Sequence, residues 1–291
     1  MDSKDFQLLV ELDNNARQSY QSLGTRVSLS AHSVRDRLNR LKSKGILQGF
    51  MLSIDSSIFG RDDVLLFYRG NFSRKILSEA LAAADVSWVA WKVDGAITLR
   101  LWTKSELQDI NNLFKVLGIR PSTRALTRSK RRAPLTITDL TIMDALVDDP
   151  KVPFDELLKL TGLSPNTVRN HLSLLLETKT ISIDPLLGAL ADSGELIYPL
   201  VVEGTITVDE IRRIMGETAL MRFTQDPPMK YMLCRGNSLS DVIVRTQALE
   251  NVLGVESAEI SLNREVLVST DLRHSLLRNE IKKLENDKMS Y

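Results

Sequence analysis

Basic side chains crowd one short segment near the start of the chain, residues 30–44, which reads SAHSVRDRLNRLKSK. Its five basic residues are Arg35, Arg37, Arg40, Lys42 and Lys44. Its only acidic residue is Asp36. Guanidinium and ammonium groups at this density pair with the phosphates of a polyanion, and a guanidinium can also bind the edge of a guanine. The segment therefore predicts contact with a polyanionic partner.

A second copy of this segment lies 134 residues further along the chain. Residues 29–41 (LSAHSVRDRLNRL) and 163–175 (LSPNTVRNHLSLL) are identical at six of thirteen positions. A weaker match, VLGI at 116–119 against VLGV at 252–255, falls at nearly the same offset. Two matches at almost one spacing indicate that a unit of about 135 residues is duplicated.

The front of each unit is predicted to form three helices. In the first unit the helices are expected at 5–15, 19–27 and 30–44, and the third has Val34, Leu38 and Leu41 at the spacing of one buried helical face. Ser30 is the expected cap of that helix, and Gly45 ends it. The segment at 46–55 (ILQGFMLSID) is predicted to be a short hairpin, so the whole is typical of a winged helix-turn-helix. The second unit is expected to repeat the helices at 135–149, 153–162 and 164–177.

The back of each unit is predicted to be a ferredoxin-like βαββαβ domain. In the first unit the strands are expected at 63–72, 86–93, 96–103 and 119–126, with helices at 73–85 and 105–117. The turn between the central strands contains Asp94 and Gly95, a strong hairpin signal. The second unit has QDPPM at the same place. The predicted fold class is α+β, with two winged helix-turn-helix domains alternating with two ferredoxin-like regulatory domains and a C-terminal helix.

These elements divide the chain into six parts. The predicted boundaries are 1–60 for the first head, 61–127 for the first regulatory domain, 128–134 for a basic linker, 135–190 for the second head, 191–270 for the second regulatory domain and 271–291 for a terminal helix.

Charge is distributed unevenly between the two halves, although the chain carries a net charge of only +1. Residues 1–134 hold 22 lysines and arginines against 13 acidic residues, whereas residues 135–291 hold 16 against 24. This asymmetry favours a polyanionic partner for the front half. The single cysteine, Cys234, lies in an apolar run, which indicates a buried thiol rather than a nucleophile and fits a reducing cytoplasm. No apolar run is long enough to span a membrane, so the expected location is cytoplasmic.

Residues 5–60 resemble the entire DNA-binding head of the Lrp/AsnC (leucine-responsive, feast/famine) transcription regulators. The matching features are Asn-Ala-Arg after the first helix, the Ser-x-x-x-Val-Arg start of the third helix, and Gly-Ile-Leu-x-Gly-Phe in the wing. The resemblance implies a prokaryotic regulator that binds double-stranded DNA and self-associates as a dimer through its regulatory domains. It also implies an amino-acid-like effector. The chain departs from the family because two units share one polypeptide, like a tethered and diverged dimer.

The first recognition helix is the expected DNA-binding element. Because the N-terminal residues of such a helix contact bases and later basic residues contact phosphates, the predicted base-reading residues are Ala31, His32, Ser33 and Arg37. The predicted phosphate anchors are Arg35, Arg40, Lys42 and Lys44. Arg37 is the best candidate for a bidentate contact with guanine. The alternative is an ordinary helix with a solvated charged face.

The second head is predicted to be degenerate, because residues 135–190 hold four basic and eight acidic residues. Without phosphate anchors its helix would be poorly held on a duplex, although polar side chains there could still bind bases. The linker residues Arg128, Lys130, Arg131 and Arg132 are either accessory DNA contacts or a solvated connector. Asp94 and Gly95 are the candidate effector site, on the family resemblance, but the turn they form explains them equally well.

Two other function classes compete with a DNA-binding regulator. Siroheme (tetrapyrrole) decarboxylases resemble the same head-plus-βαββαβ arrangement, but acid–base chemistry on a tetrapyrrole calls for histidine or comparable groups in the regulatory domain. His32 and His171 lie in the recognition helices and His274 lies in the tail. The expectation is therefore no enzymatic activity, no catalytic residue, no cofactor and no metal. The other alternative is a non-enzymatic interaction protein or corepressor.

Overall fold

The first head begins with three helices that pack around one apolar core. A computed structural model describes residues 2–127, 134–188, 190–192 and 195–289. The elements of this head are α1 (Ser3–Asn14), α2 (Tyr20–Val27), α3 (Ala31–Ser43), β1 (Leu47–Ile54) and the short 3₁₀ helix η1 (Ser56–Phe59). Asp2 and Asp5 form a capping box at the start of α1, and the Ser30 hydroxyl accepts from the backbone N–H of Ser33 at the start of α3. The predicted helices are confirmed.

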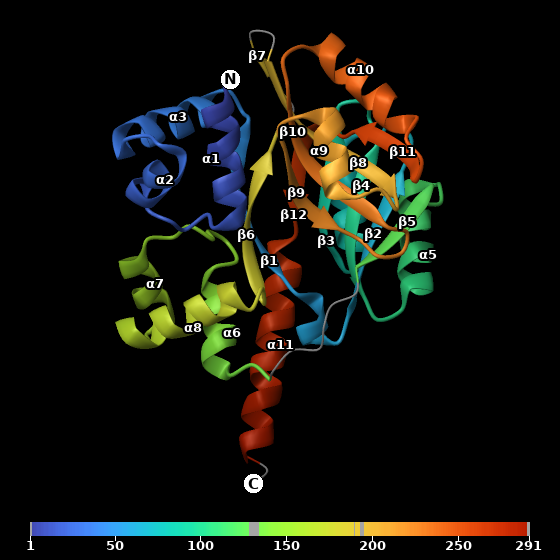
Figure 1. The fold of residues 1–291 in the computed structure, drawn as a ribbon. Helices are drawn as coiled ribbons and strands as arrows, with labels where there is room; N and C mark the ends of the chain where they lie inside the picture. The colour runs from blue at the N-terminus through green and yellow to red at the C-terminus, as the bar shows by residue number, and fades with distance from the viewer. Residues whose placement is uncertain (1, 128–133, 189, 193–194, 290–291) are drawn as a thin grey trace.

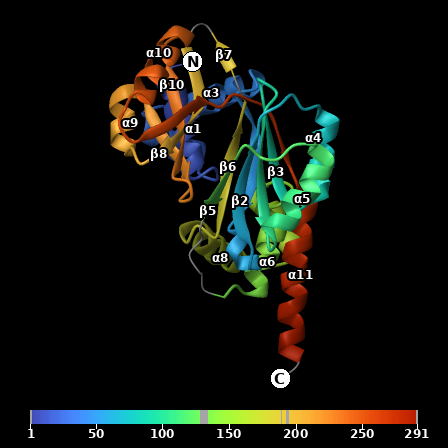
Figure 2. The same ribbon diagram turned by 90° about the vertical axis from the view of Figure 1, so that its right-hand side faces the viewer.

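The first regulatory domain is a sheet with two covering helices (Figure 2). Its elements are β2 (Asp62–Tyr68), α4 (Arg74–Ala83), β3 (Val86–Lys92), β4 (Ile97–Thr103), α5 (Glu106–Leu117) and β5 (Thr123–Thr127). The sheet has the order β12-β3-β4-β2-β5, and all its neighbours are antiparallel. The βαββαβ order predicted for residues 61–127 is therefore present.

The second unit repeats the scheme. Its head consists of α6 (Ile137–Ala145), α7 (Phe154–Thr161), α8 (Pro165–Glu177) and β6 (Ile181–Leu187). The regulatory part consists of β7 (Leu190–Asp192), β8 (Glu195–Gly204), α9 (Val208–Met215), β9 (Thr218–Phe223), β10 (Met229–Gly236), α10 (Leu239–Glu250) and β11 (Val255–Ile260). The chain ends with β12 (Asn263–Val268) and α11 (Thr270–Met289). Even the special backbone positions recur: Ser28 and Gly162, then Gly45 and Lys179, have positive φ at an offset of 134.

The wing predicted as a hairpin within residues 46–55 is wrong. These residues form the single strand β1, which pairs antiparallel with β6 of the second head. The register runs from Leu47 opposite Leu187 to Ile54 opposite Ile181. The ladder lies between the heads and the regulatory sheets (Figure 1). The partner strand β6 lies between 127 and 140 residues further along the chain. No local sequence pattern therefore reveals the pairing.

Strand β12 also crosses between the units. It was expected in the second regulatory domain, residues 191–270, but it pairs with β3 at the edge of the first sheet. The second sheet has the order β11-β8-β10-β9, with β7 paired to β8. The second unit therefore completes the sheet of the first.

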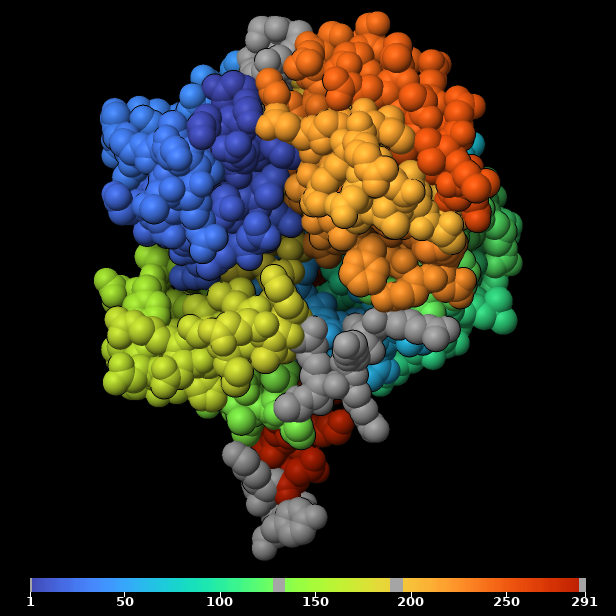
Figure 3. Space-filling model, viewed as in Figure 1, coloured from blue at the N-terminus to red at the C-terminus, as the bar shows by residue number. Residues whose placement is uncertain are grey.

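The hydrophobic cores cross in the same way. The core of the first head includes Ile197 and Leu233 from the second sheet, whereas the core of the second head includes Leu52, Trp102 and Leu277 from elsewhere in the chain. The heads also touch directly, because Arg17 donates to the carbonyl oxygens of Pro150 and Val152 at 2.6 and 2.8 Å. Figure 3 shows the two heads side by side, blue above green. Each head is thus held by the other unit.

Helix α11 connects the second unit to the first through the buried side chain of Arg273. The Arg273 side chain is fully buried and donates to the carbonyl oxygens of Leu52, Ser87 and Ser269 at 3.0, 2.9 and 2.7 Å. Its guanidinium also lies 5.3 Å from the ring centroid of Trp102. The C-terminal turns of α11 extend past the rest of the molecule (Figures 1 and 2). Among the described residues, no helix combines the length and apolar character needed to cross a bilayer.

Replacing Arg273 with methionine is expected to lower the free energy of unfolding by roughly 2–4 kcal/mol, because buried carbonyl oxygens lose a charged donor. The matched control is Arg278→Met, on the same helix but with a side chain that is 62% exposed, which should change stability by less than about 0.5 kcal/mol. Urea denaturation of both variants measures the difference. Equal effects of the two variants would show that the buried hydrogen bonds of Arg273 do not stabilise the fold more than an exposed arginine does.

Candidate nucleic-acid interface

Helix α3 presents a polar stripe to solvent because its apolar side chains all point inward. Val34, Leu38 and Leu41 are buried in the core of the head. The exposed residues on the helix are His32, Arg35, Asp36, Asn39, Arg40, Lys42 and Ser43. The predicted contact residues Ala31 and Ser33 are partly exposed, and Ser30 caps the helix as predicted. The stripe is long enough to lie along a groove, since thirteen helical residues span about 20 Å.

Three side chains of the stripe hold one another at the N-terminal end. Arg35 donates to Nδ1 of His32 at 2.8 Å, and Nε2 of His32 lies 3.1 Å from a carboxylate oxygen of Asp36. All three side chains are more than half exposed. This network orders the region where a recognition helix contacts base edges.

Arg37 does not belong to the stripe. Its guanidinium turns back to α1, where it donates to both carboxylate oxygens of Asp2 at 2.8 Å and to Oδ1 of Asp5 at 2.9 Å. Arg40 donates to Oδ2 of Asp5 at 2.6 Å, but its side chain remains 46% exposed. The Asp5 side chain is fully buried. These contacts tie α3 to the start of α1.

The ion pair between Arg37 and Asp2 requires that the Asp2 carboxylate be ionised. Partial burial alone would raise the pKa of Asp2, but hydrogen bonds from Arg37 and from the backbone N–H of Asp5 hold that pKa below its ordinary value of 3.8. The hydrogen bond to Asp2 in turn raises the pKa of Arg37. Both groups are therefore charged at neutral pH.

The second head keeps the tie with different residues. At the offset of 134, His171 stands in the place of Arg37 and Asp139 in the place of Asp5, and His171 Nδ1 lies 2.7 Å from Oδ1 of Asp139. Burial alone would raise the pKa of Asp139, but hydrogen bonds from Thr136 and His171 lower it. Because a head with few basic residues retains this contact, it serves the helical packing rather than DNA.

The outer surface of α8 differs from that of α3. Leu174 and Leu176 occupy the places of Arg40 and Lys42, and the Leu174 side chain is exposed. Arg169, the counterpart of Arg35, lies with its guanidinium 5.1 Å from the ring centroid of Phe154. The second head thus has the shape of the first but keeps only Arg169 among the basic positions of the helix.

Asn39 is a candidate that the sequence reasoning missed. It is exposed, one helical turn beyond Arg35 and Asp36 on the same stripe. A carboxamide can bind adenine through both its donor and its acceptor. Its spacing of seven residues from His32 places it on the same helical face and was the available signal in the sequence. The predicted linker contacts Arg128, Lys130, Arg131 and Arg132 lie outside the described residues.

The candidate effector residue Asp94 borders a cavity of about 560 Å³. Its wall also carries Arg69, Lys92, Glu203 and Glu259, and Arg69 pairs with Glu259 at 2.7 Å. Burial lowers the pKa of Lys92. Gly95 has a φ of +89°, and a Cβ there would meet Oδ1 of Asn71 at 2.8 Å, so the turn itself requires glycine.

Comparisons with known proteins agree on the heads. Residues 1–42 match the AsnC-type helix-turn-helix domain, and residues 135–181 match the winged helix-turn-helix DNA-binding domain. LrpB, a transcriptional regulator of Bacillus subtilis, is 28% identical over 114 residues, which cover 38% of this chain and 76% of that protein. The chain resembles the Lrp/AsnC family, and its first head is of AsnC type. The predicted resemblance is confirmed, and the tandem arrangement adds a second head to the family's usual plan.

Two other HTH-type transcriptional regulators match over shorter stretches. The regulator Rv2324 of Mycobacterium tuberculosis is 35% identical over 60 residues, or 21% of this chain and 40% of its own length. Ptr1 of Methanocaldococcus jannaschii is 36% identical over 66 residues, or 23% and 45%. The chain therefore spans less than half the length of these two relatives.

Solved structures align at lower identity. The siroheme decarboxylase NirDL is 15% identical with a TM-score of 0.47, covering 97% of this chain and 100% of its own. LrpC of B. subtilis is 19% identical with a TM-score of 0.33, covering 46% and 98%. Likeness at this level identifies neither an activity nor a ligand.

Arg37→Met is expected to lower the free energy of unfolding by about 1–3 kcal/mol, because it leaves buried Asp5 with fewer donors. Arg37 also pairs with Asp2, whose lowered pKa means that this pair stabilises the fold fully above the ordinary pKa of an aspartate and less as the pH falls through the pKa of Asp2 in the folded protein. The deficit should therefore be present at pH 7 and shrink below pH 3.8. Chemical denaturation across pH measures it.

Arg35→Met is the matched control for this test, since the Arg35 side chain is 55% exposed and contacts the surface of its own helix. It should leave stability nearly unchanged. If Arg37→Met also unfolds like the unaltered protein, the tie contributes nothing and Arg37 becomes available to a base.

Proposed function

We propose that the protein is a sequence-specific DNA-binding transcription regulator that inserts α3 into the major groove. The observation that carries the proposal is the exposed stripe of α3, on which basic and amide side chains stand clear of the core on a head of AsnC type. A helix of this width fits the major groove, and its cations would replace counterions condensed on the phosphates.

The geometry refines which residues would do this. His32, Arg35 and Asn39 stand where base edges would lie, while Arg40, Lys42 and Lys44 follow toward the end of the helix, where phosphates would lie. Arg37, the first choice for guanine from sequence, is committed to Asp2 and Asp5. Its predicted base contact would require breaking both ion pairs.

The second head would contribute shape and packing. Its α8 lacks the phosphate anchors of α3, and its surface offers leucines in their place. The two heads together correspond to a dimer built within one chain, so the DNA site would be read asymmetrically. A corepressor role through this acidic half remains compatible with DNA binding by the first.

An enzymatic function finds little support in the residues. His32 and His171 lie on the recognition helices, and His274 pairs with Asp144 at 2.5 Å. None of the three lines either of the two large cavities. The described residues offer no group of three or more side chains suited to a metal ion. We therefore propose regulation without catalysis.

The test of the function is the double variant Lys42→Ala/Lys44→Ala, which removes two exposed cations at the phosphate-facing end of the helix. Binding of the intact protein to duplex DNA should weaken for every sequence, and the dependence of log affinity on log salt should fall by about two, one for each lost phosphate contact. Fluorescence anisotropy at several salt concentrations measures both. Arg169→Ala in the second head should change neither.

Asn39→Ala is a control of a different kind, because it removes no charge. It should leave the salt dependence unchanged and relax preference at one base pair by about 1–3 kcal/mol. An unaltered protein that fails to bind duplex DNA in dilute buffer would refute the proposed function.

A small zwitterionic effector, such as an amino acid, would fit the cavity beside Asp94. Lys92 and Arg69 could face its carboxylate, and Asp94 or Glu203 its ammonium group. Calorimetric titration with L-amino acids should detect binding. Lys92→Met should lower the affinity about tenfold, because it removes a charged donor to the carboxylate of the ligand. Lys75→Met, at an 87% exposed side chain, should have no effect. If no amino acid gives a binding heat, the proposal of an amino-acid effector at this cavity fails.

A further inference from the structure

A second cavity, of about 610 Å³, lies between the two regulatory sheets. Helix α1 of the first head and the β1–β6 ladder also contribute to its wall, through Asp13, Met51 and Asp184. Its volume is in the range of small-molecule sites. No residue named in the proposed function lines it, so it is a separate feature of the molecule.

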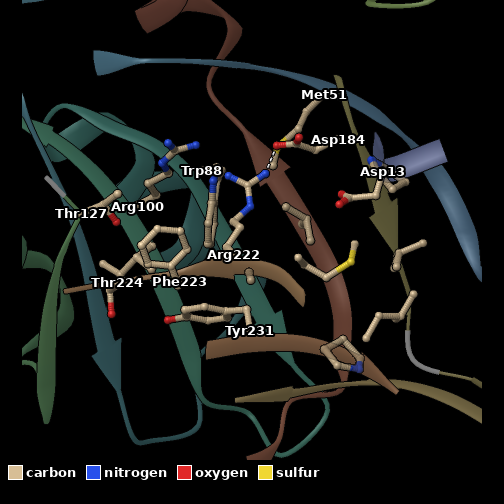
Figure 4. A pocket seen from close by; sticks show the side chains of 18 of the residues that line it. Asp13, Met51, Trp88, Arg100, Thr127, Asp184, Arg222, Phe223, Thr224 and Tyr231 are labelled. Atoms are coloured by element: carbon tan, nitrogen blue, oxygen red, sulfur yellow. Dashed lines mark hydrogen bonds and ion pairs between the residues drawn. The ribbon is translucent and has the colours of Figure 1, made fainter. Parts of the chain in front are cut away.

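The wall of this cavity is mostly apolar and carries three aromatic rings, those of Trp88, Phe223 and Tyr231 (Figure 4). The Phe223 side chain is 56% exposed, so its ring is available to an occupant of the cavity. The Nε1 donor of Trp88 is buried without a hydrogen-bond acceptor in the described part of the chain. The exposed ring suits an occupant with an apolar body.

Both guanidinium groups of the wall are already neutralised. Arg100 donates to Asp63 from Nε at 2.9 Å and from a terminal nitrogen at 2.6 Å. Arg222 donates to Asp184, which also accepts from Ser53. An anionic ligand would therefore have to displace a carboxylate from one of these pairs. The cavity does not offer a free cation.

The remaining carboxylates of the wall are those of Asp55 and Asp13. Asp55 is committed, because it accepts from the backbone N–H and hydroxyl of Ser57. Asp13 differs: within the described residues its carboxylate accepts no hydrogen bond and has no cation within ion-pair distance. Arg222 and Lys179 act on it only at longer range, and burial raises the pKa of Asp13. Figure 4 shows this carboxylate turned toward the interior of the cavity.

We propose that this cavity binds an amphipathic organic cation, an amine on an aromatic or aliphatic body, with Asp13 as its counterion. The aromatic walls favour such a ligand twice, since they cover its apolar body and their faces attract positive charge. We expect a cation rather than an anion or a neutral molecule, because the unpaired charged group among the described residues of the wall is the Asp13 carboxylate. The inference goes beyond the proposed function and does not require that the protein bind DNA.

The test uses three probes that share a biphenyl body and differ in charge. They are 4-phenylbenzylamine, 4-phenylbenzyl alcohol and biphenyl-4-acetate, titrated calorimetrically into the intact protein at pH 7.5 without DNA. The amine should bind about tenfold or more tightly than the alcohol, as expected for a hydrogen-bonded charge pair. The acid should bind more weakly than the alcohol.

Two variants locate the site. Asp13→Asn should remove the advantage of the amine over the alcohol while leaving the alcohol affinity unchanged. Phe223→Ala, at an exposed ring that the fold does not need, should weaken all three probes together. The proposal is overturned if no probe binds, if the acid or alcohol matches the amine, or if the advantage of the amine survives in Asp13→Asn with its thermal melting unchanged. If Asp13→Asn fails to fold, the charge series and Phe223→Ala decide alone.

Discussion

The antiparallel ladder of β1 with β6 is the interaction on which the rest of the molecule depends. Two strands alone are marginally stable in water, so this ladder persists because both of its ends are covered. Leu47 packs into the core of the first head, and Leu52 and Ile54 pack into the core of the second. One strand from each unit thus fuses two repeats into one body. The heads, the sheets and the cavity between them are all positioned by it.

Duplication within one chain gives an internal comparison that a symmetric dimer lacks. Contacts that both copies keep, such as Arg37 with Asp5 and His171 with Asp139, are those the fold requires. Positions at which the copies differ, such as Arg40 and Leu174, are those the fold does not fix, so each copy can have a different surface there. Two identical chains could not separate these roles, because any change would appear twice. The single chain is free to keep one charged helix and one neutral helix.

The sequence predicted the helices and the βαββαβ order well, because those signals are local: capping residues, helical spacing and an Asp-Gly turn. It failed for β1 and β12, since pairing with β6 and β3 depends on segments more than a hundred residues away. For the proposed site, the sequence pointed to α3, but it did not predict that Arg37 pairs with Asp2 and Asp5. Composition cannot show that a charged side chain points inward to Asp5, and only the repeat, with His171 at the same place, hinted at it. The cavity at Asp13 left no pattern at all, because its wall is assembled from eleven helices and strands.

Helix α1 links that cavity to the recognition helix. Asp13 lies at its C-terminal end, and Asp2 and Asp5, which hold Arg37, lie at its start. Eight residues of helix separate Asp5 from Asp13, about 12 Å along a rigid axis. A ligand changes an equilibrium only if it binds two conformations unequally. A displacement of α1 would change both the setting of the Asp13 carboxylate and the placement of α3, because Asp13 and the carboxylates that hold Arg37 lie on the same helix. An occupant of the cavity would therefore alter the presentation of the basic stripe only if it bound two positions of α1 unequally.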